Sequence, residues 1–298
     1  MATPAKPLTA TAPKTAPAPK VRLLRPDAAT LSGLLLAFGG ILGGLIMEGG
    51  KLKDVSQVTA ALIVLGGTLG AVLVSTPMSV LAAAVRRLAH VVVDKVDTPE
   101  AVIDELIRYA TMARRNGLVS LENDAMQIEN PFLRKALMLA VDGTDLQEIR
   151  NMMQLEIEMA ERQAFAEARV FECAGGYSPT IGIIGAVMGL IQVMKNLANI
   201  EEVGHGIAVA FVATVYGVGL ANVVLLPVST KIKARVDGET ALKEMMLEGV
   251  VAIVEGLNPK IIRNKLEAYQ RESKRKSIYS TMSSTAPARP AGTRSARK

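Results

Sequence analysis

The sequence predicts an all-α membrane protein with four transmembrane helices in two hairpins and a helical cytoplasmic domain inserted between spans 2 and 3. Of the 298 residues, 50% are hydrophobic, and the mean hydropathy is +0.30. Four uncharged apolar stretches have the length of about 20 residues that a helix needs to cross a bilayer. They occur as two pairs, and a long polar segment separates the pairs.

Both ends of the chain, residues 1–26 and 273–298, are rich in Ala, Pro, Thr or Ser and basic residues. This composition predicts disordered basic tails. No apolar core follows the first basic residues, so we expect no cleavable signal peptide. The net charge of +6 would suit nucleic acid, but much of the excess lies in the tails and only 3% of residues are aromatic. We therefore expect no nucleic-acid partner.

The first pair of spans, 28–47 and 55–74, defines a membrane segment at 27–75, and the second pair, 177–194 and 206–230, defines one at 177–230. Lys and Arg are concentrated before the first span, after the second and after the fourth, whereas the connectors EGGKLKD and KNLANIEEVGH hold few. Basic residues favour the cytoplasmic side of a membrane. Both termini and the central region are therefore predicted to be cytoplasmic.

The central region, 76–176, and the segment 231–272 have the apolar periodicity of amphipathic helices. Thr98-Pro99 predicts a helix start, and Asn116-Gly117 predicts its end. A second long helix is expected from about 144 to 173, and it can continue directly into the third span. The segment after the fourth span is expected to form one or two helices with a break near Gly256 and Pro259.

Small residues recur four apart in every span, a spacing that lets helix backbones approach closely in lipid. The pairs are Gly39/Gly43, Gly40/Gly44, Gly66/Gly70, Gly185/Gly189, Ala210/Thr214 and Ala213/Gly217. In the second hairpin, the candidate packing residues are Gly182, Gly185, Gly189 and Gly217. These faces can pack within one subunit or against other chains, and glycine on several faces favours an oligomer.

None of the four spans contains Asp, Glu, Lys, Arg or His. A proton relay needs a titratable group in the membrane, and this chain offers only hydroxyls and amides there. Either the protein moves no ions, or a partner chain supplies the carboxylate. In the second case, Thr180 and Thr214 could line the path. The alternative is that each hydroxyl bonds back to its own helix.

Pro179 allows two interpretations. Ser178-Pro179 is a plausible N-cap and first-turn pair, which would make the proline a helix start. If the helix instead continues from the central region, the proline leaves a backbone carbonyl unpaired and creates a hinge. Pro227, near the end of the fourth span, poses the same choice.

Nothing in the sequence indicates an enzyme, a metal site or a cofactor. A single cysteine, Cys173, and two distant histidines, His90 and His205, give no metal-ligand cluster. There is no Gly-rich phosphate loop and no catalytic triad pattern. Charges of the central region such as Arg114 and Glu122 would ordinarily form a solvated face.

Several motifs, in order, carry a resemblance that covers roughly residues 25–270. They are MEGGKL, LIVLGGTLGAVLVSTP, ARRNGLVSLE, GGYSPTIGIIGAVMGLIQVM and AVAFVATVYGVGLANVVLLPVSTKI. Together they resemble the MotA family of flagellar motor stator subunits, and the last two also resemble the broader MotA/TolQ/ExbB proton channel family.

The resemblance implies a multi-pass protein of the bacterial inner membrane that forms a homopentamer around a MotB dimer. A MotB aspartate carries the ion, MotB binds peptidoglycan, and the ring pushes on the rotor protein FliG. Pro179 and Pro227 match the paired prolines of the family, and Thr214 matches its fourth-span threonine. Arg114 and Glu122 match the charges that face the rotor.

Ala186 bears on the ion, because sodium-type stators of the family tend to have Thr seven residues after the third-span proline. The resemblance therefore implies protons. The alternatives are a TolQ/ExbB-like energy-transducing channel subunit for an envelope process, a non-motor solute transporter, and a structural membrane scaffold. TolQ and ExbB relatives typically have three spans, so the two-plus-two layout and ARRNGLVSLE favour the stator.

Overall fold

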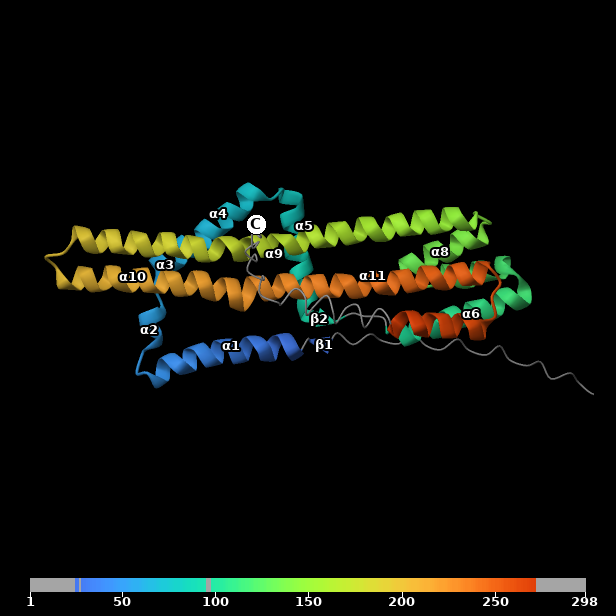
Figure 1. The fold of residues 1–298 in the computed structure, drawn as a ribbon, viewed down its shortest axis with the longest axis horizontal. Helices are drawn as coiled ribbons and strands as arrows, with labels where there is room; N and C mark the ends of the chain where they lie inside the picture. Colours follow the sequence, from blue (N-terminus) through green and yellow to red (C-terminus); the bar gives the residue numbers. More distant parts are fainter. Residues whose placement is uncertain (1–24, 27, 95–97, 272–298) are drawn as a thin grey trace, which may run out of the picture.

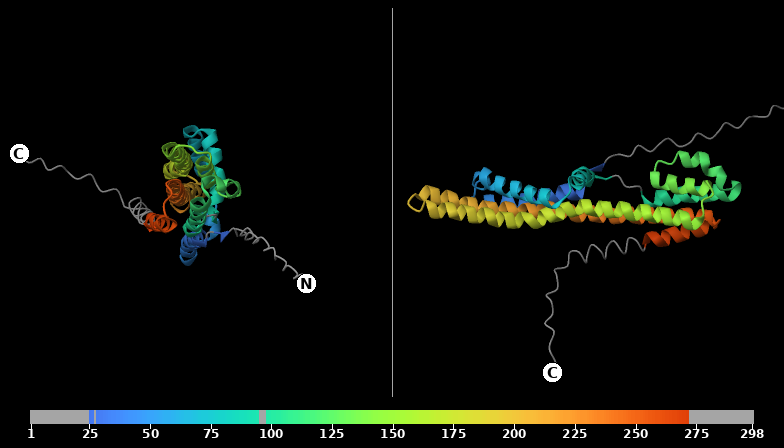
Figure 2. Two further views of the ribbon diagram at one scale, coloured as in Figure 1. Left: turned by 90° about the vertical axis from the view of Figure 1, so that its right-hand side faces the viewer. Right: turned by 90° about the horizontal axis from the view of Figure 1, so that it is seen from above.

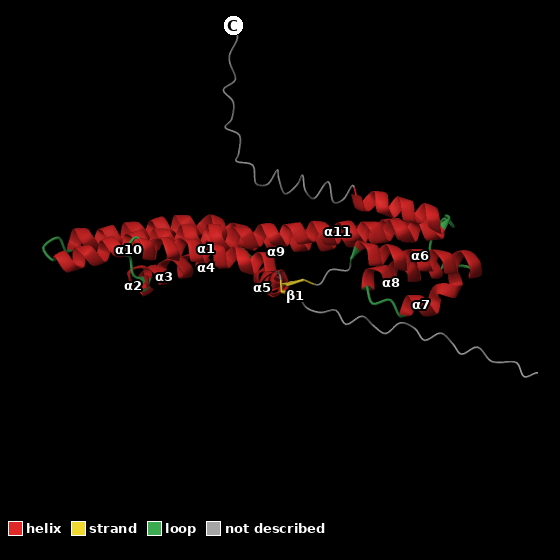
Figure 3. Ribbon diagram, turned by 90° about the horizontal axis from the view of Figure 1, so that it is seen from below, coloured by secondary structure: helices red, strands yellow, loops and turns green. Residues whose placement is uncertain are grey.

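The structure is a computed structural model that describes residues 25–26, 28–94 and 98–271. The basic tails predicted at 1–26 and 273–298 lie outside the described residues, apart from Arg25 and Pro26. Helix dominates the described chain (Figure 3). The predicted all-α fold class is confirmed: the described residues contain four helices long and apolar enough to cross a membrane, with a helical region between the second and third.

The first hairpin consists of α1 (Ala28–Met47) and a helical stretch that reaches Ser75. A short helix, α2 (Leu52–Val55), connects them. The second span is built from three pieces: α3 (Val58–Ala61), the π-helix η1 (Leu62–Gly66) and α4 (Gly67–Ser75). The amphipathic helix α5 (Met78–Val92) then leads out of the span. The two-residue strands β1 (Arg25–Pro26) and β2 (Val93–Asp94) pair antiparallel beside its end.

Two very long helices run side by side through the whole molecule (Figures 1 and 2). The first is α9 (Leu146–Lys195), a single helix of 50 residues. The second is continuous from residue 200 to residue 254 and comprises α10 (Ile200–Gly219), the π-helix η3 (Leu220–Leu225) and α11 (Leu226–Val254). The third and fourth spans are therefore the outer halves of helices that also build the polar end of the molecule.

The polar end, here called the helical domain, consists of short helices packed on the inner halves of α9 and α11. They are α6 (Pro99–Asn116), the 3₁₀ helix η2 (Leu118–Leu121), α7 (Glu122–Met126) and α8 (Pro131–Val141). Proline occupies the first turn of α6 and of α8, and the Asn130 side chain caps α8 by accepting from two backbone amides. A continuous apolar core joins these helices to α9 and α11.

Tyr109 is the largest fully buried side chain in this core. Burial, with a hydrogen bond from its hydroxyl to Glu105, raises the pKa of Tyr109 to about 12. The phenol therefore stays neutral at physiological pH.

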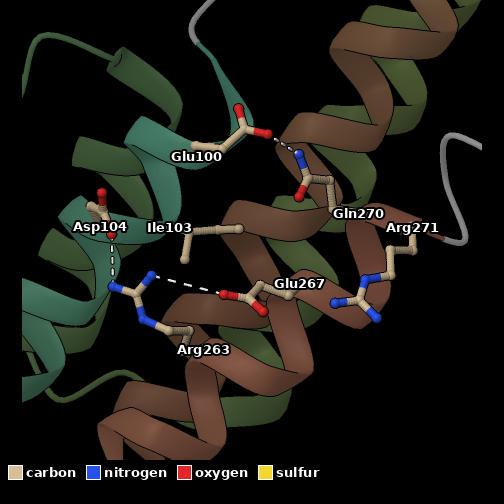
Figure 4. Close-up of a pocket in the computed structure, with 7 residues that line it drawn as sticks. All are labelled: Glu100, Ile103, Asp104, Arg263, Glu267, Gln270 and Arg271. Atoms are coloured by element: carbon tan, nitrogen blue, oxygen red, sulfur yellow. Dashed lines mark hydrogen bonds and ion pairs between the residues drawn. The ribbon is translucent and has the colours of Figure 1, made fainter.

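Residues 259–271 form a last helix that folds back onto α6. Arg263 donates to Asp104 at 2.7 Å, and Gln270 donates to Glu100 at 2.6 Å. Figure 4 shows these residues around the shallow pocket between the two helices. The break before this helix comes at Gly256, whose φ of +71° suits glycine, so the predicted interruption near Gly256 and Pro259 is where the chain reverses.

Candidate functional site

The candidate site begins at the seam between α9 and α10, where the predicted packing glycines of the second hairpin gather. Gly182, Gly185, Gly189 and Gly217 are all buried. A Cβ on Gly182 would lie 2.9 Å from the carbonyl oxygen of Ala213, and one on Gly217 would lie 2.7 Å from that of Ser178. Backbone therefore touches backbone along this seam, an approach that side chains larger than hydrogen would prevent.

The two threonines proposed for an ion path each hydrogen-bond within their own helix. Thr180 is exposed and donates to the carbonyl of Tyr177 at 2.7 Å. Thr214 is half-buried and donates to the carbonyl of Ala210 at 3.1 Å. Each hydroxyl oxygen still has lone pairs with which to accept from a passing water or protonated group.

Pro179 lies inside α9, so it does not begin a helix. Its missing amide cannot bond to the carbonyl of Gly175, four residues earlier. Pro227 lies at the start of α11, directly after the π-helix η3, within a helical course that continues on both sides. Both prolines thus interrupt hydrogen bonding inside long helices, which is the arrangement that produces kinks. The open question of helix start or in-helix break is settled for Pro179 in favour of the break.

Ala186 follows Gly185 on α9 and is half-buried. Its side chain has no hydroxyl, so this position offers an ion no oxygen ligand. Hydroxyl and carbonyl oxygens are the ligands that hard cations require.

Arg114 and Glu122 flank one sharp corner of the helical domain. Arg114 is in the last turn of α6 and Glu122 opens α7. Gly117 turns the chain between them with a φ of +84°, and Leu121 anchors the corner by burying its side chain completely. Both charged side chains are exposed. Among the described residues neither forms an ion pair, so these two side chains present opposite charges to solvent.

Other polar residues that hold the spans together were only partly anticipated. Ser178 donates from a fully buried position to the carbonyl of Gly217 at 2.9 Å, and Tyr216 donates to the carbonyl of Val55 at 2.5 Å. Ser229, on α11, donates to the carbonyl of Ala168 at 2.9 Å. No sequence pattern distinguishes these cross-helix donors from serines that bond to their own helix.

A partly buried ion pair joins α5 to the part of α9 that leads from the seam to the helical domain. Arg87 of α5 donates to Glu167 of α9, whose side chain is only 5% exposed, and Gln163 donates to the other carboxylate oxygen. No sequence pattern predicts this pair, because its partners are eighty positions apart. It fixes α5, which continues from the second span, to α9.

Comparisons with known proteins agree with this arrangement. Residues 31–117 match the family model described as motility protein A N-terminal, and residues 124–245 match the MotA/TolQ/ExbB proton channel family. Motility protein A of Bacillus subtilis is 36% identical over 82% of this chain and 90% of its own length. Chemotaxis protein PomA of Vibrio alginolyticus is 33% identical over 84% of this chain and 97% of its own.

Two solved structures show the same fold. The MotAB structure from C. jejuni matches with a TM-score of 0.78 and 35% identity, over 82% of this chain and 95% of that chain. The flagellar MotAB stator complex from Bacillus subtilis matches with a TM-score of 0.74 and 34% identity, over 81% and 95%. The chain therefore belongs to the motility protein A family, within the MotA/TolQ/ExbB proton channels.

Proposed function

We propose that this chain is the channel-forming subunit of a flagellar stator, which works with a MotB-like single-span partner and converts proton flow into torque on the rotor protein FliG. The relatives and the MotAB structures support the assignment. The observation that carries the mechanism is a close-packed seam with no ionisable residue in its apolar stretches and with two prolines interrupting its long helices.

The uncharged spans mean that the partner must bring the titratable group. A carboxylate on the partner's helix would bind and release protons beside the α9–α10 seam, where Thr180 and Thr214 offer hydroxyl oxygens. Ala186 supports protons as the ion, because it adds no oxygen ligand of the kind that would select sodium.

Bending at the prolines would be transmitted to the rotor by rigid helices. From Pro179 to the start of α9 at Leu146, an α-helix rises about 50 Å. A tilt of about ten degrees at the proline would move the far end by about 9 Å, on the same rise per residue. The far ends of α9 and α11 build the helical domain, where Arg114 and Glu122 are exposed. We assign these two charges to contact with the rotor.

The orientation follows from the basic residues that flank the spans. Arg86 and Arg87 follow the second span, and Lys231, Lys233 and Arg235 follow the fourth. Basic flanks favour the cytoplasmic side, so we place the helical domain and both termini in the cytoplasm and the spans in the bacterial inner membrane. Copies of the chain, a homopentamer in our proposal, surround the partner.

The test is expression of the chain with a candidate MotB-like partner in a strain without stators. We expect swimming and partner-dependent proton leak in sodium-free medium, with neither when the partner's membrane carboxylate is replaced. Glu122→Lys and Arg114→Glu should abolish swimming and leave the leak unchanged, because they lie far from the spans. The matched control is Glu148→Lys, an exposed acid on α9. Proton leak without any partner would refute the proposal, as would full motility of the charge-reversed variants.

A further inference from the structure

Two buried serines bond the long helices to each other on either side of the prolines. Ser178 immediately precedes Pro179 and donates to Gly217 of α10 at 2.9 Å. Ser229 follows Pro227 by two residues and donates to Ala168 of α9 at 2.9 Å. The two bonds are reciprocal, since one runs from α9 to its partner helix and the other runs back. Ser178 is 0% exposed and Ser229 is 3% exposed.

These bonds bound residues 168–178 of α9 and 217–229 of the facing helix, a stretch that we call the proline window. Pro179 directly follows its end on α9. Within it, the side chain of Leu226 packs directly against the backbone of α9 at Gly175. A Cβ on Gly175 would lie 2.7 Å from Cδ2 of Leu226, the residue before Pro227. The carbonyl of Gly175 is also the one that Pro179 deprives of its helical donor. Pro227, and the carbonyl that Pro179 deprives of its donor, therefore both lie between the two serine bonds.

The two sides of the window differ in length. As ideal α-helix, the stretch from Ala168 to Ser178 would rise about 15 Å, and the stretch from Gly217 to Ser229 about 18 Å. The π-helix η3, Leu220–Leu225, lies on the longer side. Its hydrogen bonds enclose one residue more than those of an α-helix, so it takes up part of the difference. The extra residue of the π-helix thus makes the longer side deformable, opposite the Pro179 break, and we call this deformability the π-helical slack. The two serine bonds fix both ends of the stretch that contains it.

We propose that Ser178 and Ser229 are positioning residues that clamp the proline window at both ends, so that α9 and α10–α11 bend together rather than slide past each other. Without the clamps, the π-helical slack would relax by sliding, and less of the bend would reach the helical domain. This inference rests on the proposed stator function. It assigns the serines to coupling, in addition to their part in helix packing.

The test uses Ser178→Ala, Ser229→Ala and the double variant, each in the full complex with its partner in a strain without stators. Torque per stator unit at stall is measured from the step size as units join a motor tethered to a bead, and the number of steps gives the units engaged. An interhelical hydrogen bond of this kind is worth about a threefold change in an equilibrium. We expect lower torque per unit, lowest in the double variant, at an unchanged number of units.

The matched control is Thr230→Ala, because Thr230 neighbours Ser229 but donates to Leu226 of its own helix at 3.0 Å. It should keep the torque per unit. If an alanine variant fails to assemble, Ser→Cys, which keeps the shape with a weaker donor, takes its place and must lower the torque per unit. Unchanged torque per unit, or a loss confined to the number of units, overturns the clamp. Failure of the unaltered complex to leak protons or turn the motor would instead overturn the stator function.

Discussion

Gly189 and Gly206 meet across the α9–α10 seam at backbone distance. A Cβ on Gly189 would lie 2.6 Å from the carbonyl oxygen of Gly206, and one on Gly206 would lie 2.9 Å from that of Gly189. Neither obstacle is a flexible side chain that could swing aside. The seam therefore depends on glycine at these two residues for its spacing.

We expect Gly189→Ala to destabilise the complex by about 1–3 kcal/mol, as overpacking does elsewhere. The control is Gly238→Ala on α11, where a Cβ meets no atom within 4 Å. There the better helix propensity of alanine should stabilise by up to about 1 kcal/mol. Thermal unfolding of the detergent-solubilised complex measures both. A Gly189→Ala complex that melts at or above the unaltered complex would contradict the geometry.

At this scale, spacing in the sequence identified small-residue faces but not what they touch. Gly66 and Gly70 have the predicted spacing, yet a Cβ on either meets nothing within 4 Å. Gly67, between them and outside the predicted pairs, lies against Ile181, whose Cγ2 would be 2.7 Å from a Cβ. A period gives a face of a helix, whereas the contact depends on how the neighbouring helix is rotated.

At the scale of elements, one carboxylate ties three helices of the helical domain together. Glu248 of α11 accepts from Arg150 of α9 at 3.2 Å and also pairs with Lys265 of the helix 259–271. Burial alone would raise the pKa of Glu248, but hydrogen bonds and charge from Lys265 and Arg150 outweigh it and hold the pKa below its ordinary value.

A lowered pKa stabilises the fold at pH values above the ordinary carboxyl pKa, and this stabilisation is lost as the pH falls through the lowered value. We therefore expect Glu248→Gln to lower the unfolding midpoint at neutral pH. In acid, the midpoints of the variant and of the unaltered protein should become equal. Chemical denaturation followed from about pH 7 to about pH 3 covers this range. The control is Glu148→Gln, at an exposed acid of α9. Its unfolding midpoint should change with pH in the same way as that of the unaltered protein. A constant gap between the Glu248→Gln and unaltered curves would show that the ion pairs do not link stability to pH.

Helix boundaries were predictable where local chemistry sets them. Thr98-Pro99 and Asn116-Gly117 correctly bound α6, because caps and turns depend on adjacent residues. The two π-helices had no such signal. In η3 the extra residue of the π-helix offsets the shorter stretch of α9 that faces it. The π-helix therefore arises from packing rather than from the sequence LANVVL. The unbroken length of α9 through Gly175, Gly176 and Pro179 likewise reflects the helix it packs against.

At the scale of the whole molecule, the first span has almost no support from the rest of the chain. No residue of α1 is buried. A Cβ on Gly39, Gly40, Gly43 or Gly44 would meet no atom within 4 Å. Lipid can cover the large apolar side chains of α1, but a surface of glycine gains little from lipid and much from a closely packed helix. This unfilled face indicates that other copies of the chain complete the fold.

We therefore expect the detergent-solubilised complex to contain several copies of this chain for each partner assembly, as native mass spectrometry would show. Gly43→Leu should reduce the copy number, because the added side chain holds a neighbouring helix away from the glycine face. Leu31→Phe adds bulk about 120° around the same helix and should leave the copy number unchanged. A monomeric unaltered chain would refute assembly through α1. An intact assembly carrying Gly43→Leu would mean that lipid alone covers α1. In that case the proline-bearing hairpin would have to form the ring unaided, because α9 and α10 also expose apolar faces through Ile184 and Phe211.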